Sequence, residues 1–212
     1  MATYDLEEQE KIDELKTWWD AYGTLVIIAV VTFVAGIGGT QGWNYYQKQQ
    51  SAGAAELYAS LQKVVASKDP KKISDAAYLL MEKFSGSGYA PRAALISARA
   101  SFDAGDVQNA RSRLQWALDN AKEEELKNLA RLRLAGLLLD EKKHDEALKL
   151  LETRHGESFA GLYADLRGDI LVAAGRAAEA RNAYQTALDK IDKKSAYRNL
   201  VQMKLNALGD AK

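Results

Sequence analysis

The sequence predicts an all-α protein with one N-terminal membrane-spanning helix, a stack of helical hairpins after it, and a C-terminal capping helix. Two observations predict this architecture. A window of 27 residues, from Ala21 to Gln47, contains no charged side chain. Beyond it, a helix–turn–helix pattern recurs about every 34 residues, and alternation typical of strands is nowhere sustained.

The chain opens with an acidic segment, residues 1–23. Seven acidic residues against Lys11 and Lys16 give this segment a net charge of −5. Its large apolar residues follow the spacing i, i+3, i+4, i+7: Leu15, Trp18, Trp19 and Tyr22. This spacing is typical of a helix that lies at a membrane surface. A secretory signal peptide would begin with a short basic region instead, so we interpret the segment as an uncleaved cytoplasmic tail with an interfacial helix.

Residues 24–46 are predicted to cross the membrane. Leu25 to Gly39 has Thr32 as its only polar side chain, and the apolar stretch extends to about 18 residues, close to the ~20 that cross ~30 Å of hydrocarbon. Tryptophan and tyrosine favour the headgroup layers, and they flank the stretch on both sides: Trp18, Trp19, Tyr22, Trp43, Tyr45 and Tyr46. A buried core helix and a cleaved signal peptide are the alternatives.

Two further features of this helix lead to expectations about its packing and its orientation. Gly38 and Gly42 form a small-xxx-small pair, which either packs against a partner transmembrane helix or faces lipid. Lys11 and Lys16 precede the span, whereas Lys48 alone follows it within the first twenty residues. Because positive charge near a span favours the cytoplasmic side, we expect a cytoplasmic N-terminus and an external domain over residues 47–212.

The external domain carries the hairpin repeat. A small residue recurs in the second helix of each hairpin, and a bulky residue follows it four positions later. The small residues are Ala76, Ala110, Ala147 and Ala180. Twelve residues before the last three alanines stand further small residues: Ala98, Ala135 and Gly168. Antiparallel helices approach closely where both present small side chains. A single hairpin cannot bury its apolar face, so several must stack.

This spacing resembles the tetratricopeptide repeat, and the match covers about Glu56 to Lys190. An ordinary antiparallel helical bundle is the alternative. Trp43 to Leu57 is expected to continue the membrane helix into the first repeat helix. Ala196 to Leu208 is expected to form the capping helix that such stacks require.

Composition argues against several classes of function. Cysteine is absent, and His144 and His155 are not spaced as a metal-binding pair. No nucleophile elbow and no phosphate-binding glycine loop occurs. We therefore expect no enzymatic activity, no cofactor and no metal. The net charge of zero, without a concentrated basic patch, argues against nucleic acid as a partner.

In tetratricopeptide stacks the first helix of each hairpin lines a concave groove. We take Ala98, Ala135 and Gly168 as the close-packed positions. The groove residues are then expected six and three residues before each of them, and one and four residues after. This register predicts a protein-binding groove that includes Tyr58, Leu61, Arg92, Leu95, Arg99, Phe102, Leu129, Leu132, Leu139, Leu162, Asp165 and Asp169. Its apolar content suggests an apolar or amphipathic polypeptide segment as the ligand. The alternative for Leu129 and Leu162 is that they belong to the core between repeats.

Three segments carry a resemblance to a known family: Gly42–Tyr46, Ala164–Asp169 and Gln202–Asn206. The chain resembles, nearly end to end, the YfgM family of ancillary subunits of the bacterial SecYEG translocon. The resemblance implies an inner-membrane protein of Gram-negative bacteria with a periplasmic tetratricopeptide-like domain. It further implies association with the translocon, pairing with a membrane-anchored periplasmic chaperone of the prolyl-isomerase type, and help in handing over unfolded, secreted polypeptides.

The leading hypothesis is therefore a non-enzymatic, membrane-anchored interaction protein at the translocon. One alternative is a regulator whose acidic tail sequesters a cytoplasmic response regulator, with the repeats as a sensor. Another is a scaffold for envelope assembly. Deletion of residues 1–14 would separate the first alternative from the leading hypothesis, because only a role of the tail would be lost.

Overall fold

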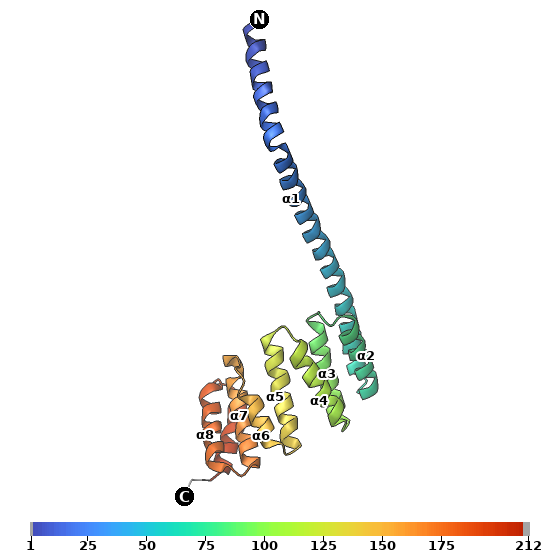
Figure 1. The fold of residues 1–212 in the computed structure, drawn as a ribbon. Helices are drawn as coiled ribbons and strands as arrows, with labels where there is room; N and C mark the ends of the chain where they lie inside the picture. Colours follow the sequence, from blue (N-terminus) through green and yellow to red (C-terminus); the bar gives the residue numbers. More distant parts are fainter. Residues whose placement is uncertain (1, 210–212) are drawn as a thin grey trace. The chain divides into compact units, whose positions relative to one another are not determined.

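The computed structural model describes the backbone of residues 2–209 and the side chains of residues 11–209. Within the described backbone the chain forms nine α-helices and no strand (Figure 1). The helices are α1 (Ala2–Val65), α2 (Pro70–Lys83), α3 (Tyr89–Asp103), α4 (Val107–Asn120), α5 (Glu124–Asp140), α6 (His144–Leu151), α7 (Glu157–Ala173), α8 (Ala177–Lys190) and α9 (Tyr197–Ala207). The all-α prediction is confirmed.

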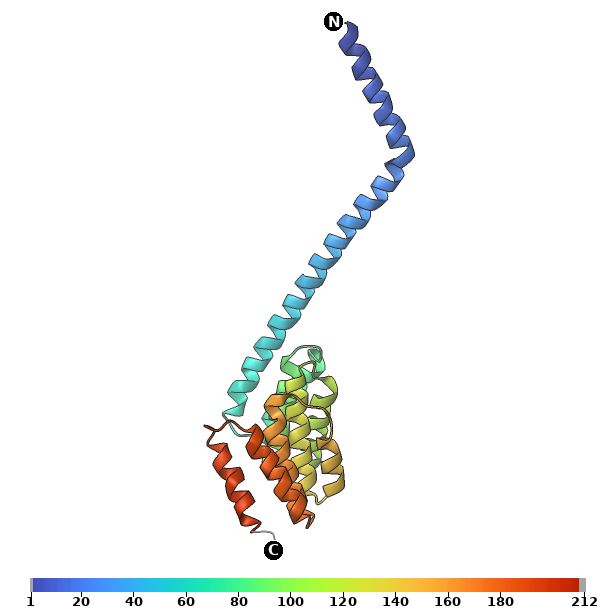
Figure 2. The same cartoon turned by 90° about the vertical axis from the view of Figure 1, so that its left-hand side faces the viewer.

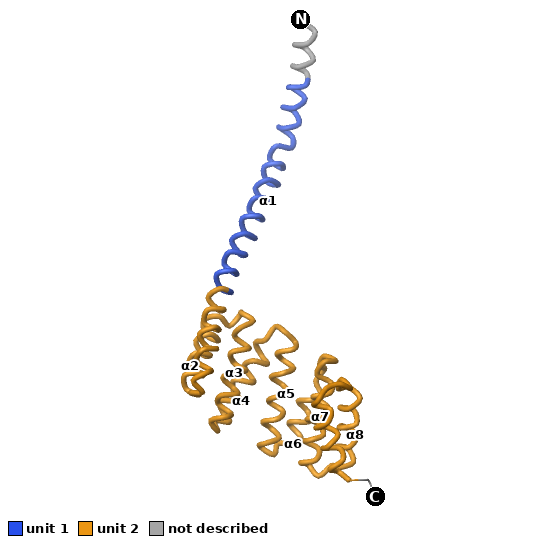
Figure 3. The backbone as a smooth tube through the Cα atoms, turned by 180° about the vertical axis from the view of Figure 1, so that it is seen from behind, with its two compact units in different colours: residues 1–51 blue, residues 52–212 orange. Residues whose placement is uncertain are grey.

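The chain divides into two compact units, Met1–Ser51 and Ala52–Lys212 (Figure 3). The division falls within α1, which is a single helix from Ala2 to Val65. Gly53 does not interrupt α1, so the expectation that one helix runs from the apolar segment into the first hairpin is confirmed. The boundaries expected at residues 23/24 and 46/47 stay predictions.

Between Leu25 and Gly39, α1 is apolar on nearly all sides. Its large apolar side chains from Leu25 to Ile37 are mostly exposed, with Phe33 at 69%. A core helix would bury these side chains, so that alternative does not fit. The helix is long and apolar enough to cross a membrane. The one polar side chain at its centre is satisfied internally, because the Thr32 hydroxyl donates to the carbonyl of Ile28 at 2.7 Å.

Aromatic pairs lie at both ends of this apolar stretch. The ring centroids of Trp18 and Tyr22 are 5.9 Å apart, and those of Trp43 and Tyr46 are 6.1 Å apart. Both pairs are neighbours on one face of α1, at helical spacings of four and three residues. Their arrangement matches the two aromatic belts of a membrane-spanning helix.

In the second unit the helices stack as antiparallel hairpins in chain order (Figures 1 and 2). The end of α1 pairs with α2, α3 with α4, α5 with α6 and α7 with α8, and α9 packs against α8. The first helices of successive hairpins also touch: α3 contacts α5, and α5 contacts α7. These three helices therefore form one continuous layer, on which a surface shared by neighbouring hairpins can form.

Each of the last three hairpins turns in the same way. Gly105, Lys142 and Gly175 have φ values of +79°, +61° and +75°, the left-handed conformation that ends many helices. The residue after each donates its backbone N–H to a carbonyl five residues earlier, for example Asp106 to Ser101 at 2.9 Å. This satisfies a carbonyl that the helix end would leave unpaired. The recurring turn fixes where the second helix of each hairpin begins.

The predicted small-residue contacts are present in these three hairpins. Ala110, Ala147 and Ala180 are all 0% exposed. At Gly168 a Cβ atom would lie only 2.3 Å from Cε1 of Tyr184. The Tyr184 ring therefore occupies the space that a larger side chain at Gly168 would need, which is the pairing of a small residue with a bulky one that the spacing predicted.

The first hairpin departs from the predicted register. Ala76 is only half-buried, whereas its neighbour Ala77 is completely buried, so the choice of Ala76 is wrong by one residue. The reason lies in how α2 begins, with Asp69 capping the backbone N–H groups of Lys71 and Lys72 and Pro70 in the first turn. Twelve residues before Ala76 the facing helix offers Val64 rather than a small residue. The close approach of this hairpin lies instead at Gly53, where a Cβ atom would be 2.8 Å from the Phe84 ring.

The core follows the stack as three apolar clusters. One lies between the end of α1, α2 and α3, around Leu61 and Leu80. The next joins α3, α4 and α5 around Leu114. The last joins α5 to α9 around Ile170 and Leu171. Each cluster uses residues from neighbouring hairpins, so the stability of one hairpin depends on the next.

Two glycines on neighbouring first helices give a matched test of the small-residue contact. Gly168→Ala places a Cβ atom inside the Tyr184 ring's space and should lower the free energy of unfolding by roughly 1–3 kcal/mol. Gly136→Ala meets nothing within 4 Å and should stabilise its helix by up to about 1 kcal/mol. Thermal unfolding of the full chain, followed by circular dichroism, measures both. Equal shifts of the same sign would contradict the contact.

Candidate protein-binding groove

Two cavities lie on the layer formed by α3 and α5. The smaller, about 300 Å³, lies between α3, α4 and α5. The larger, about 760 Å³, extends from α3 and α5 to the end of α1 and the start of α2. Arg99 and Arg133 line both cavities. We call the two together the α3–α5 groove; each has a volume typical of ligand sites.

Six of the groove residues predicted from the sequence line these cavities: Arg92, Leu95, Arg99, Phe102, Leu129 and Leu139. The register works here because α3 and α5 keep their predicted small-residue contacts, at Ala98 and Ala135. Phe102 is 42% exposed, whereas Leu95 is almost fully buried and also belongs to the core. Leu129 is half-buried and packs on the same core cluster, so it serves both the core and the cavity wall.

Other predicted groove residues lie elsewhere. Leu61 is 0% exposed and sits inside the first core cluster, so its assignment to an open groove is wrong. Leu132 packs against the last core cluster. Tyr58 packs beside Tyr89, with ring centroids 5.1 Å apart. Leu162 is half-buried and lies outside the α3–α5 groove.

The sequence register missed several positions that line the groove, and one of them bears the groove's unpaired arginine. Ile96 and Arg133 both stand two residues before the close-packed small residue of their helix, and both face the larger cavity. The predicted register took positions three before and one after, which both lie to one side of this position around the helix. The identical spacing in two units is the signal that would have found it.

The positive charges of the groove differ in how they are compensated. Arg92 pairs with Glu123 at 3.0 Å, and Arg99 pairs with Asp103 at 2.8 Å. Arg133 has no carboxylate within 4 Å among the side chains of residues 11–209, and it donates only a long hydrogen bond, 3.4 Å, to the carbonyl of Leu95. Desolvation in the cavity, and next the charge of Arg99, lower the pKa of Arg133.

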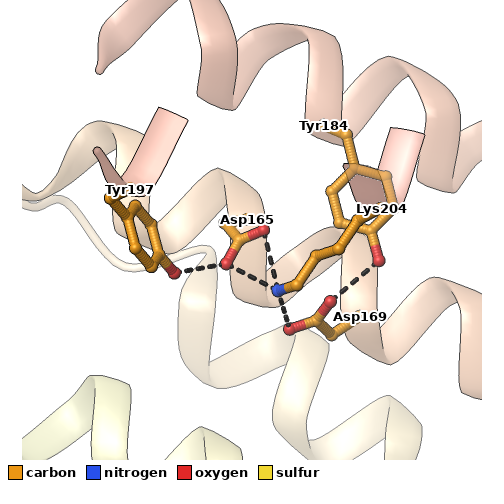
Figure 4. Close-up of polar contacts among 5 residues, drawn as sticks. All are labelled: Asp165, Asp169, Tyr184, Tyr197 and Lys204. Atoms are coloured by element: carbon orange, nitrogen blue, oxygen red, sulfur yellow. Dashed lines mark hydrogen bonds and ion pairs between the residues drawn. The ribbon is translucent and has the colours of Figure 1, made fainter. Parts of the chain in front are cut away.

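The fourth hairpin, α7 and α8, has a different character, because its two predicted groove aspartates are bound by α9 (Figure 4). Lys204 donates to both oxygens of Asp165, at 3.0 and 2.9 Å, and to Asp169 at 2.7 Å. The hydroxyl of Tyr197 donates to Asp165 at 2.5 Å, and that of Tyr184 to Asp169 at 2.8 Å. Asp165 is 2% exposed. The capping helix thus covers this part of the predicted groove, and neither aspartate is free for a ligand.

This network is charge-compensated and half-buried, since the side chains of Lys204 and Asp169 are 26% and 30% exposed. Burial alone would lower the pKa of Lys204, but hydrogen bonds to Asp165 and Asp169 and their negative charges outweigh it, so the pKa is raised. Burial, and then hydrogen bonds to the aspartates, raise the pKa of Tyr184 and Tyr197 well above their usual value. The network therefore favours a charged lysine and neutral tyrosines. It holds α9 on α7 as long as these states persist.

The glycine pair of α1 has no neighbour in the described chain. A Cβ atom at Gly38 or at Gly42 would meet nothing within 4 Å. Contact with a partner transmembrane helix and exposure to lipid are both compatible with this geometry.

The chain is similar to known proteins over nearly its full length. Residues 16–210 match the family model of the tetratricopeptide repeat-like domain. The chain is 33% identical to the ancillary SecYEG translocon subunit of Neisseria gonorrhoeae, over 96% of this chain and 98% of that protein. It is 31% identical to the protein of that name from Haemophilus influenzae, over 97% and 99%, and 30% identical to that from Escherichia coli, over 98% and 99%.

The raised pKa values predict alkaline destabilisation. The contribution of a group whose folded pKa is raised is complete below its unfolded pKa, 10.5 for lysine and 10.0 for tyrosine, and is lost as pH rises through the folded value. The free energy of unfolding should therefore fall above about pH 10. Urea unfolding between neutral and alkaline pH measures it. Lys204→Met should cost roughly 3 kcal/mol at neutral pH and flatten the alkaline decline; an unchanged decline would contradict the role of Lys204.

Proposed function

Since the chain belongs to the family of ancillary SecYEG translocon subunits, with a tetratricopeptide repeat-like domain, we propose that it associates with the SecYEG translocon in the inner membrane. In this proposal α1 anchors the protein and the repeat domain binds other proteins without catalysing a reaction. The partners proposed for the repeat domain are a membrane-anchored periplasmic chaperone of the prolyl-isomerase type and translocated, unfolded polypeptides.

The observation that carries the proposal is the extent of the similarity. It spans the apolar part of α1 and the whole repeat stack together, over 96–98% of this chain in three relatives. A likeness limited to the repeats would support only a fold, because repeat stacks serve many functions. Similarity across both parts supports a shared arrangement of anchor and binding domain.

The proposed orientation places the N-terminus in the cytoplasm and the repeat domain in the periplasm. The two lysines before the apolar stretch, against one shortly after it, support this orientation. The acidic character of the first 23 residues is compatible with it, since acidic residues contribute little to the positive-inside rule.

The α3–α5 groove is the proposed site for polypeptide. It combines apolar walls, among them Phe102 and Leu139, with arginines along α3 and α5. Concave surfaces of this kind on helical repeats bind extended or helical segments of other proteins. The fourth hairpin does not contribute to this site, because α9 covers its aspartates.

Protease accessibility tests the proposed orientation. Protease added to spheroplasts should digest the chain beyond Lys48 and leave a small membrane-bound fragment, because the repeat domain would face the periplasm. Immunoblotting with antibodies against each end measures the two products. Full protection of the repeat domain, while a known periplasmic protein is digested, would contradict the orientation.

Charged substitutions in the groove test the binding role. Phe102→Asp together with Leu129→Asp should weaken binding to unfolded model polypeptide by about thirtyfold or more, because each places a charge against an apolar ligand surface. Binding of a labelled, reduced model protein to the detergent-solubilised full chain, followed by fluorescence anisotropy, measures this. Crosslinking in native membranes followed by capture of the chain then shows whether SecYEG contact persists.

The control for these substitutions is Leu200→Asp, since Leu200 is also 42% exposed but lies on α9. It should leave polypeptide binding unchanged. Equal loss in the control and the groove variant, or full binding in both with intact helicity, would overturn the groove assignment. If the groove variant binds less polypeptide but every variant still crosslinks to SecYEG, the translocon contact lies outside the groove.

A further inference from the structure

Arg133 is the one arginine of the α3–α5 groove that has no carboxylate partner among the side chains of residues 11–209. Its nearest acceptor is the carbonyl of Leu95, at 3.4 Å, which is a weak hydrogen bond. Its guanidinium offers five N–H donors in a planar fork that matches a carboxylate. Arg133 is exposed, so most of its donor capacity faces solvent and is unused within the described part of the chain.

The charges around Arg133 reinforce this imbalance. From α3, Arg99 approaches closely enough to lower the pKa of Arg133 by repulsion, second to the effect of desolvation. From the loop before α2, Lys68 lines the same cavity, and Arg92 lies further along α3. The carboxylates that line the groove are Asp103, which pairs with Arg99, and Asp140.

Asp140 does not compensate Arg133. It stands seven residues further along α5, roughly 10 Å along the helix axis, and it lines only the smaller cavity. Between the two cavities the groove is thus positive: two arginines are adjacent, and one of them is unpaired.

Apolar side chains surround this charge. Leu95, Ile96 and Leu129 line the larger cavity beside Arg133, and Leu139 and Phe102 line the smaller one. A ligand that fills both cavities must pass over Arg133, which lines each of them. Burial of a charge without a partner is costly, so a purely apolar ligand would lose affinity at this point.

We propose that the α3–α5 groove binds polypeptide segments in which an acidic side chain stands between apolar ones, and that Arg133 holds the acidic group. This inference rests on the proposed function and adds the chemistry of its ligand. Leucine-like side chains enter the two cavities, and the carboxylate between them accepts hydrogen bonds from the Arg133 guanidinium. A basic segment is repelled at the same point by Arg133 and Arg99.

Three labelled synthetic peptides test the chemistry. They share leucines at both ends and differ only in a central pair of glutamates, glutamines or lysines. Fluorescence anisotropy measures their binding to the purified full chain in detergent micelles. The glutamate peptide should bind about tenfold or more tightly than the glutamine peptide, as expected for a charged hydrogen bond. This preference should shrink as salt is added, because salt screens exposed charges.

Arg133→Gln should abolish the preference for the glutamate peptide, because no guanidinium remains to hold its carboxylates. Arg154→Gln is the matched control, since Arg154 is an exposed arginine in the loop after α6 and lines neither cavity; it should keep the preference. Circular dichroism confirms that both variants are folded.

The outcomes separate this inference from the proposed function. Equal binding of the glutamate and glutamine peptides, or a preference for lysine, would overturn the role of Arg133 while polypeptide binding by the groove stands. A glutamate preference that survives Arg133→Gln would overturn it as well. If none of the three peptides binds to the folded chain, both the inference and the groove assignment fail.

Discussion

The repeat domain depends on the close contact between the two helices of each hairpin. That contact exists only where one helix presents alanine or glycine and the other fills the space beside it, as Tyr184 does over Gly168. Since side chains on a helix recur at fixed angles, one such contact sets which residues of the first helix turn toward the neighbouring hairpin and which turn outward. The layer of α3, α5 and α7, and the groove on it, follow from these contacts. In the first hairpin this contact lies at a different place, between Gly53 and the Phe84 ring, and the register differs by one residue.

The two ends of the layer are used differently. Toward the N-terminal side, α3 and α5 leave cavities with apolar walls and a positive strip. Toward the C-terminal side, two aspartates of α7 that occupy equivalent positions are held by Lys204 and two tyrosine hydroxyls. Pairing and hydrogen bonding make burial of these carboxylates tolerable. The same register thus produces an open surface in one hairpin and, in another, a polar contact covered by the capping helix. The two differ because the residues at those positions differ in charge and in the side chains that lie opposite them.

Much of the fold was predictable because its determinants are local or periodic. The apolar stretch of α1, the hairpin spacing and the capping helix are all readable from the order of residues. The groove was predictable only in part. Six of its residues follow from the register. Leu61 was misplaced because the small-residue contact of the first hairpin, at Gly53 and Phe84, does not follow the spacing of the other hairpins. Lys204 was missed for another reason: its partners lie 35 and 39 residues away, and no repeat relates α9 to α7. Contacts of that kind depend on the packed structure.

Because α1 contains both the apolar segment and the first helix of the repeat stack, the choice of where to truncate the chain matters. The last turns of this helix, from Ala52 to Val65, are the first half of the first hairpin, and Leu61 is fully enclosed by residues of α2 and α3. A truncation that removes all of α1 therefore takes away more than an anchor. It uncovers the apolar faces of Ile73 and Leu80, an exposed patch that favours aggregation. A soluble fragment must instead begin ahead of Ala52, so that the repeat stack keeps the helix that closes its N-terminal end.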